Sequence, residues 1–151
     1  MRKFLIEISD RRGGRACDRR LMRRVLRSVL AERVQGAELS VAVVGDQEMA
    51  RLNRQYLGRD EPTDVIAFPY RTQADFIEGE VVVNADQARR QAAGAAHSVE
   101  DELLLYAVHG VLHLLGHDDA DPQDRRRMHE RALQVLASAG RPLDARTLLD
   151  E

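Results

Sequence analysis

Two histidines one helical turn apart are the residues of this sequence best placed to do chemistry. His109 and His113 stand four residues apart in a stretch made mostly of Leu and Val. Residues four apart on a helix share one face, with Cβ atoms about 6 Å apart, so two imidazoles can bind one cation. Gly116 then ends the stretch, and the chain beyond it can supply a third ligand from residues 117–119. The spacing predicts a metal site on a long helix and the following turn.

The same segment has the spacing of the metzincin zinc signature, with one replacement that changes its chemistry. A metalloprotease needs Glu directly after the first His, to take a proton from the zinc-bound water, and this chain has Gly110 there. Asp119 occupies the signature's third ligand position, which gives a His₂-carboxylate set. We favour Asp119 over His117, which directly follows the helix stop. The alternative, two core histidines without a metal, would bury two imidazoles at a high free-energy cost.

Composition excludes several other classes of protein. The 151 residues are 44% hydrophobic and 32% charged, as expected for one soluble globular domain spanning residues 1–151. The single cysteine, Cys17, excludes an internal disulfide and a multi-thiolate zinc site. Aromatic residues reach only 4%, too few for a base-stacking platform. We see no signal peptide and no apolar run that could span a bilayer, so we expect a cytoplasmic protein.

The net charge of −2 hides an uneven distribution. Residues 1–34 carry a net charge of +7, almost all of it from arginine. Within this segment an amphipathic helix is expected, with arginines on the side opposite its apolar stripe: Arg19, Arg20, Arg23, Arg24 and Arg27. The simpler interpretation is that these arginines form a helix face that is only solvated. The more specific interpretation is that they form a docking surface for RNA or for a ribosomal partner.

Hydrophobic periodicity predicts the elements that position these residues. Strands are expected over residues 3–8, 39–44, 64–70 and 80–84, and helices over about 18–30, 46–56, 87–96, 98–116 and 121–140. Ser98 followed by Asp101 indicates a capping box at the start of the histidine helix. The order of elements predicts an α+β fold, with a mixed sheet of about four strands covered by helices.

Three motifs together resemble those of the YbeY family of bacterial endoribonucleases. Residues 52–56 read LNRQY, residues 60–69 read DEPTDVIAFP, and residues 109–118 read HGVLHLLGHD. The resemblance covers most of the chain and implies a single-strand-specific RNase that matures ribosomal RNA 3′ ends and takes part in ribosome quality control. It also implies one zinc ion held by three ligands, which fall on His109, His113 and, by position only, Asp119.

The chain departs from the family pattern at a residue tied to activity. The family has Arg directly after the Tyr of its LNxxY motif, where this chain has Leu57. Arg59 or Arg54 could then bring a guanidinium to the phosphodiester; the alternative is that both are solvent-facing loop arginines. Asp118 is the candidate base nearest in sequence. Ala67 also replaces the usual Ser, and Glu80 the usual Asp.

The hypothesis is metal-assisted cleavage of single-stranded RNA, with ribosomal RNA and the small ribosomal subunit as partners and neither DNA nor a membrane involved. The alternative is a ribosome-associated binding factor of the same fold, with a structural metal and weak or no nuclease activity, which the loss of the family Arg at Leu57 favours. A small metalloprotease is the third interpretation.

Overall fold

The computed structural model describes residues 3–12, 17–94, 97–116 and 121–143. They form four strands and five helices: β1 (Lys3–Asp10), α1 (Arg19–Ala31), β2 (Gly36–Val44), α2 (Asp46–Leu57), β3 (Val65–Gln73), β4 (Phe76–Asn84), α3 (Ala85–Ala93), α4 (Val99–Leu114) and α5 (Pro122–Ser138). The expected α+β fold with a four-stranded mixed sheet is confirmed.

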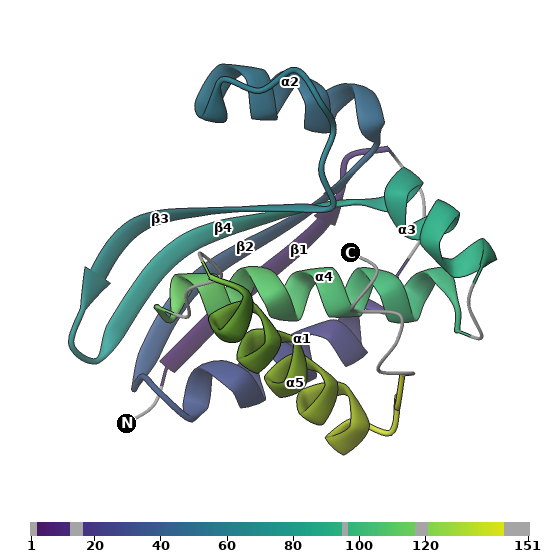
Figure 1. The fold of residues 1–151 in the computed structure, drawn as a ribbon. Coiled ribbons are helices and arrows are strands. Elements are labelled where there is room, and N and C mark those ends of the chain that lie inside the picture. Colours follow the sequence, from purple (N-terminus) through teal and green to yellow (C-terminus); the bar gives the residue numbers. More distant parts are fainter. Residues whose placement is uncertain (1–2, 13–16, 95–96, 117–120, 144–151) are drawn as a thin grey trace.

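The sheet has the strand order β1-β2-β4-β3. β2 pairs in parallel with both β1 and β4, whereas β3 pairs antiparallel with β4. β2 reads as a continuous apolar run after Ser40 because it is an inner strand with both faces covered. Helices α1, α4 and α5 lie on one side of the sheet and α2 on the other (Figure 1).

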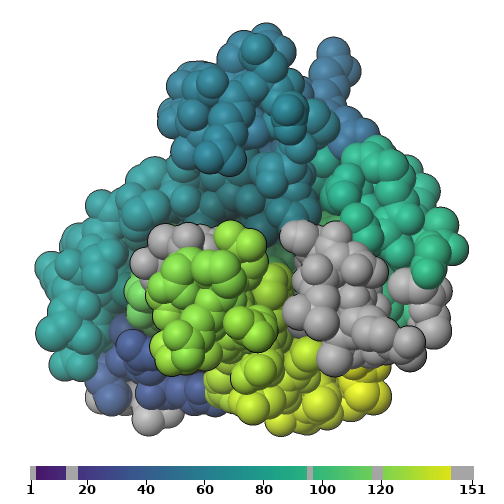
Figure 2. All heavy atoms as spheres, in the orientation of Figure 1, coloured from purple at the N-terminus to yellow at the C-terminus, as the bar shows by residue number. Residues whose placement is uncertain are grey.

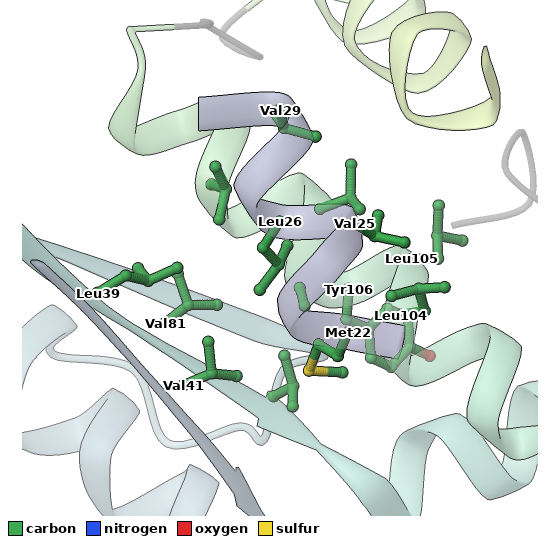
Figure 3. Packing of buried hydrophobic residues seen from close by; sticks show 14 of the residues in the cluster. Met22, Val25, Leu26, Val29, Leu39, Val41, Val81, Leu104, Leu105 and Tyr106 are labelled. Carbon is green, nitrogen blue, oxygen red and sulfur yellow. The ribbon is translucent and has the colours of Figure 1, made fainter. Parts of the chain in front are cut away.

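Two apolar cores fill the two faces of the sheet. The larger one joins the sheet to α1, α4 and α5, and Figure 3 shows part of it: Met22, Val25, Leu26 and Val29 from α1 beside Leu104, Leu105 and Tyr106 from α4 and Leu39, Val41 and Val81 from the sheet. The smaller one lies under α2 and contains Ala42, Val44, Met49, Leu52, Ile66 and Val82. Alternate residues of β4 therefore belong to different cores, as the period of a strand requires.

α4 is the central helix, and it is buried on nearly every side between the sheet, α1, α3 and α5. Its start has the expected capping box, in which the Ser98 Oγ accepts from the Asp101 N–H and the Asp101 carboxylate accepts from the Ser98 N–H. Its end is followed by Gly116 at φ +95°, a conformation that glycine adopts without strain. No helix among the described residues is both long and apolar enough to cross a membrane.

The strands extend further than the sequence analysis predicts. β4 begins at Phe76 rather than Glu80, and β2 begins at Gly36 rather than Leu39. Residues 71–79, of which more than half are polar, form the outer half of the β3–β4 hairpin. The end of the hairpin is fixed where the Gln35 N–H donates to the Asp75 carbonyl at 2.8 Å. Polar side chains are tolerated there because this half of β3 is exposed.

Candidate active site

The two histidines of α4 line one cavity, as their spacing predicts. It has a volume of about 230 Å³, and its walls are Thr63, Asp64, Val65, His109, His113, Arg125, Met128 and His129. His109 is only 5% exposed, whereas His113 is half-buried. Thr63 and Asp64 lie in the loop just before β3, Val65 begins β3, and the last three wall residues come from α5, so the cavity lies where three parts of the fold meet.

α4 lies close enough to the sheet to form this cavity because residue 110 is glycine. A Cβ atom at Gly110 would lie 2.5 Å from the Val81 Cγ1 and 3.2 Å from the Val65 Cγ2. The first distance is too short for a carbon–carbon contact, and the second is tighter than most such contacts. A glutamate at this position would force α4 away from the sheet, so the fold itself excludes the catalytic residue of a metalloprotease.

His129 of α5 meets His109 of α4 directly. The His129 Nδ1 lies 3.1 Å from the His109 Nε2, and the ring centroids are 4.8 Å apart. Burial, together with the neighbouring His129 and His113, lowers the pKa of His109 to about 3. His109 is therefore a neutral imidazole at physiological pH, which is the form that binds a metal.

The sequence analysis does not select His129, although a signal for it exists. His129 lies three and seven residues before Ala132 and Leu136, both of which are buried. It thus belongs to the inward face of α5, where an isolated polar residue needs a partner.

Asp64 adds a carboxylate to the cavity wall. Its Oδ1 accepts from the Val65 N–H at 2.8 Å and from the Thr63 hydroxyl at 3.3 Å. Burial raises the pKa of Asp64 against the effect of these hydrogen bonds. A carboxylate with a raised pKa beside a reaction centre can accept a proton, so Asp64 is a candidate base that the sequence analysis named only as part of a motif.

Two buried asparagines hold the loop that carries Thr63 and Asp64. Asn84 donates from Nδ2 to the Thr63 carbonyl at 3.1 Å, and its backbone N–H donates to the Asp64 carbonyl at 2.9 Å. Asn53, on α2, donates from its side chain to the Glu61 carbonyl. The LNxxY segment thus positions the DEPTD segment.

The predicted arginines lie elsewhere. Arg59 follows the left-handed Gly58 that ends α2, is exposed, and is not part of the cavity wall. Arg54 is also absent from that wall, and its Nε lies 3.1 Å from the Asp60 Oδ1. Leu57, 53% exposed, lines a neighbouring groove that shares Val65 and His113 with the cavity.

The predicted third ligand cannot be placed. Asp119, its alternative His117 and the candidate base Asp118 all lie outside the described residues, so these assignments stay predictions. Within the described ranges, no group of three or more His, Cys, Asp and Glu is arranged to hold a metal. The donor chemistry nevertheless fits zinc, because a buried neutral imidazole and a second imidazole face one polar cavity.

A family model and individual proteins that resemble this chain all carry the same name. The family model "Endoribonuclease YbeY" matches residues 7–140. A protein of that name from Thermobifida fusca is 38% identical over 149 residues, covering 92% of this chain and 96% of its own. Another, from Chlorobium phaeovibrioides, is 38% identical over 128 residues, covering 83% and 85%.

A solved structure supports the fold. The solution structure of a Thermotoga maritima protein matches with a TM-score of 0.58 and 24% identity, covering 89% of this chain and 91% of that one. The family match and the two relatives add to this fold similarity a membership of one family. The chain belongs to the YbeY family of endoribonucleases, hydrolases whose substrate is RNA.

Proposed function

We propose that this chain is a zinc-dependent, single-strand-specific endoribonuclease of the cytoplasm, acting in ribosomal RNA 3′ end maturation and ribosome quality control. The observation that carries the proposal is the cavity itself. His109 and His113 line it together, and His109 is held neutral by burial. Two imidazoles that line one cavity, one of them held neutral, are suited to binding a metal ion.

The residues that would hold the metal are His109, His113 and Asp119, with His117 as the alternative third ligand. When bound, a zinc ion supplies a Lewis acid that polarises a phosphoryl oxygen or lowers the pKa of water to about 7. His129 orients the His109 ring through their 3.1 Å contact. Asp64 accepts a proton at a carboxylate oxygen.

The depth of the site supports the preference for single strands. His109 is almost fully buried at the base of its cavity. A phosphodiester can approach a recessed group only if the strand bends toward it, and a flexible single strand bends more readily than a stiff duplex. The walls contain no aromatic residue besides the histidines, so contacts to phosphate rather than base stacking would hold the strand.

A cleavage assay tests this proposal. Zinc-loaded protein should cut a labelled single-stranded RNA, leave the matched duplex largely intact, and lose activity in EDTA. The His113→Ala variant should be inactive while its thermal unfolding stays cooperative. The proposal is wrong if zinc-loaded wild-type protein leaves both RNAs intact, or if His113→Ala cuts as fast as wild type.

A specific surface favours the second candidate, a ribosome-associated binding factor with weak or no nuclease activity. The five arginines of α1 are all exposed, and four of them line a groove of about 520 Å³ together with Phe4, Ser28 and Ala31. Such a surface suits the phosphates of ribosomal RNA. Co-sedimentation with small ribosomal subunits by a protein that leaves RNA intact would favour this candidate.

The basic face of α1 has its own test. Replacing Arg19, Arg20, Arg23, Arg24 and Arg27 with Gln should reduce the salt dependence of RNA or ribosome binding, since each lost phosphate contact removes about 0.7 from the log–log slope on single strands. An unchanged slope would show that the face is only solvated.

A further inference from the structure

α5 brings a second functional side chain to the cavity, one turn before His129. Arg125 lies four residues from His129, so the two share a face of the helix, and both line the cavity that contains His109 and His113. The first part of α5, coloured lime green, lies at the exposed front of the molecule in Figure 2. Arg125 is itself exposed, so its guanidinium stands where a ligand would enter.

The guanidinium of Arg125 has no partner among the described residues. Its backbone N–H donates to the Asp121 carbonyl at 3.0 Å, but no side-chain hydrogen bond or ion pair joins it to the described part of the chain. Other arginines of α5 differ: Arg127 pairs with Asp124 at 3.2 Å, and Arg131 pairs with Glu32 of α1.

No ion pair or hydrogen bond joins Arg125 to Asp64, the carboxylate that the described residues contribute to the cavity wall. The Asp64 Oδ1 is occupied by the Val65 N–H and the Thr63 hydroxyl. Within the described part of the chain, the cavity therefore presents a permanently charged group without a protein partner, one that has five N–H donors and cannot accept a hydrogen bond. Such a group is complementary to an external anion.

We infer that Arg125 binds the phosphodiester of the RNA at the cleavage site, supplying the guanidinium that Leu57 lacks. The inference rests on the proposed function and identifies the substrate-binding residue of that same site. Arg59 and Arg54 are weaker candidates, because neither lines the cavity and Arg54 is held by Asp60.

The planar fork of arginine suits this role. It can donate two parallel hydrogen bonds to two oxygens of one phosphate, which fixes the orientation of the scissile bond. The same donors stabilise the negative charge that builds up on those oxygens as the phosphorus is attacked. Arg125 would therefore contribute to binding in the ground state and more strongly in the transition state.

The test compares Arg125→Ala and Arg125→Lys with Arg126→Ala, a matched control that removes the same charge from an exposed neighbour outside the cavity. Binding of a fluorescein-labelled single-stranded RNA is measured in EDTA, where no cleavage occurs, over a series of salt concentrations. Cleavage of the same RNA is measured after zinc loading, and thermal unfolding confirms that each variant is folded.

We expect Arg125→Ala to weaken RNA binding and to lower kcat/KM by about tenfold or more. The slope of the logarithm of the binding constant against the logarithm of the salt concentration should become shallower by about 0.7. Arg125→Lys should restore the slope but only part of kcat, because an ammonium cannot form the fork. Arg126→Ala should behave as wild type.

Equal binding, slope and cleavage in Arg125→Ala and Arg126→Ala would overturn the inference. A larger loss in Arg59→Ala than in Arg125→Ala would overturn it too. If zinc-loaded wild type does not cut RNA, the proposed function fails, yet the contrast between Arg125→Ala and Arg126→Ala in EDTA still decides whether Arg125 contacts RNA.

Discussion

Gly110 links the position of α4 to the chemistry of the cavity. The glycine lets the helix backbone approach Val81, and His109 immediately before it is buried and faces His129 of α5. Glycine at residue 110 therefore has two effects. It lets α4 pack closely on β4, and it leaves the chain without the glutamate that a metalloprotease has at this position.

Gly110→Ala should destabilise the protein despite the better helix propensity of alanine. The new Cβ would lie 2.5 Å from the fully buried Val81 Cγ1 and 3.0 Å from its Cγ2. Because the clash is this close, we expect a cost of about 2–3 kcal/mol, the upper part of the usual range for overpacking, against a gain of about 1 kcal/mol from propensity. We expect a net loss of about 1–2 kcal/mol in the free energy of unfolding, measured by urea denaturation.

Gly94→Ala is the matched control for that measurement. Its Cβ would meet nothing within 4 Å, and its φ of −99° suits any residue. A Gly94→Ala variant should match wild type within about 0.5 kcal/mol. If Gly110→Ala is equally neutral, α4 does not pack against the sheet as described.

Leu57→Arg should raise the activity of this chain. Leu57 is exposed and lines a groove that shares His113 with the cavity, so an arginine there needs no burial and can reach a bound phosphate. A charge-assisted hydrogen bond worth about 1.5 kcal/mol corresponds to about a tenfold gain in kcat/KM on single-stranded RNA. Leu57→Gln, polar but uncharged, should gain much less, and equal gains in the two variants would exclude a charge effect.

The residues of the cavity were only partly predictable from sequence. His109 and His113 could be predicted because they belong to one helix, whose period fixes their relation. His129, Arg125 and Asp64 come from other elements, and their approach depends on how α5 and the start of β3 pack against α4. No local periodicity carries that information, although the place of His129 on the inward face of α5 hints at it.

At the scale of elements, one polar cluster joins the starts of α2 and α3. Asp46 begins α2 and is bound by the guanidinium of Arg90 from α3, with Nη1 at 2.6 Å from Oδ2. The side chain of Asn84 donates to the Asp46 Oδ1 at 2.8 Å while its own Oδ1 caps α3. Because Asn84 also holds the Thr63 carbonyl, this cluster supports the loop that enters the cavity.

The cluster makes the stability of the fold sensitive to acid. Arg90, together with Asn84, lowers the pKa of Asp46 to about 2, from an ordinary value of 3.8. Between those values the unfolded chain binds a proton that the folded chain does not, so the contribution of Asp46 is complete above pH 4 and is lost as the pH falls toward 2.

Asp46→Asn should therefore flatten the pH dependence of the free energy of unfolding between pH 4 and 2. The pair is partly exposed, so we expect an effect of only a few tenths to about 1 kcal/mol. An NMR titration of the Asp46 carboxyl checks the cause directly, and a midpoint near 4 would contradict it.

The order and type of the elements were predictable, whereas several boundaries were not. Each of the four strands and five helices has the apolar period or the cap that its type requires. α3 begins at Ala85, two residues before the predicted start, because Asn84 caps it. β4 extends back to Phe76 and includes Gly79. A glycine is needed at that position because a Cβ there would lie 2.9 Å from the Leu114 Cδ1, a contact with α4 that the sequence does not reveal.

At the scale of the whole molecule, the strand order could not be predicted. A mixed sheet follows from strands that alternate with helices and then form a hairpin, but several orders satisfy that pattern. The observed order places β4 between β2 and β3, so that α4 packs across β3 and β4 and meets the loop that precedes β3. The cavity is a consequence of this order, because it brings Asp64 to the helix that carries His109.

The central claim is that the cavity on α4 binds a metal ion through His109 and His113, and elemental analysis of the purified protein tests it most directly. Protein dialysed against zinc and then against buffer should retain one zinc ion per chain, and His113→Ala, folded by thermal unfolding, should retain almost none. Wild-type protein without bound metal, or a His113→Ala variant that keeps its full zinc content, would contradict the account.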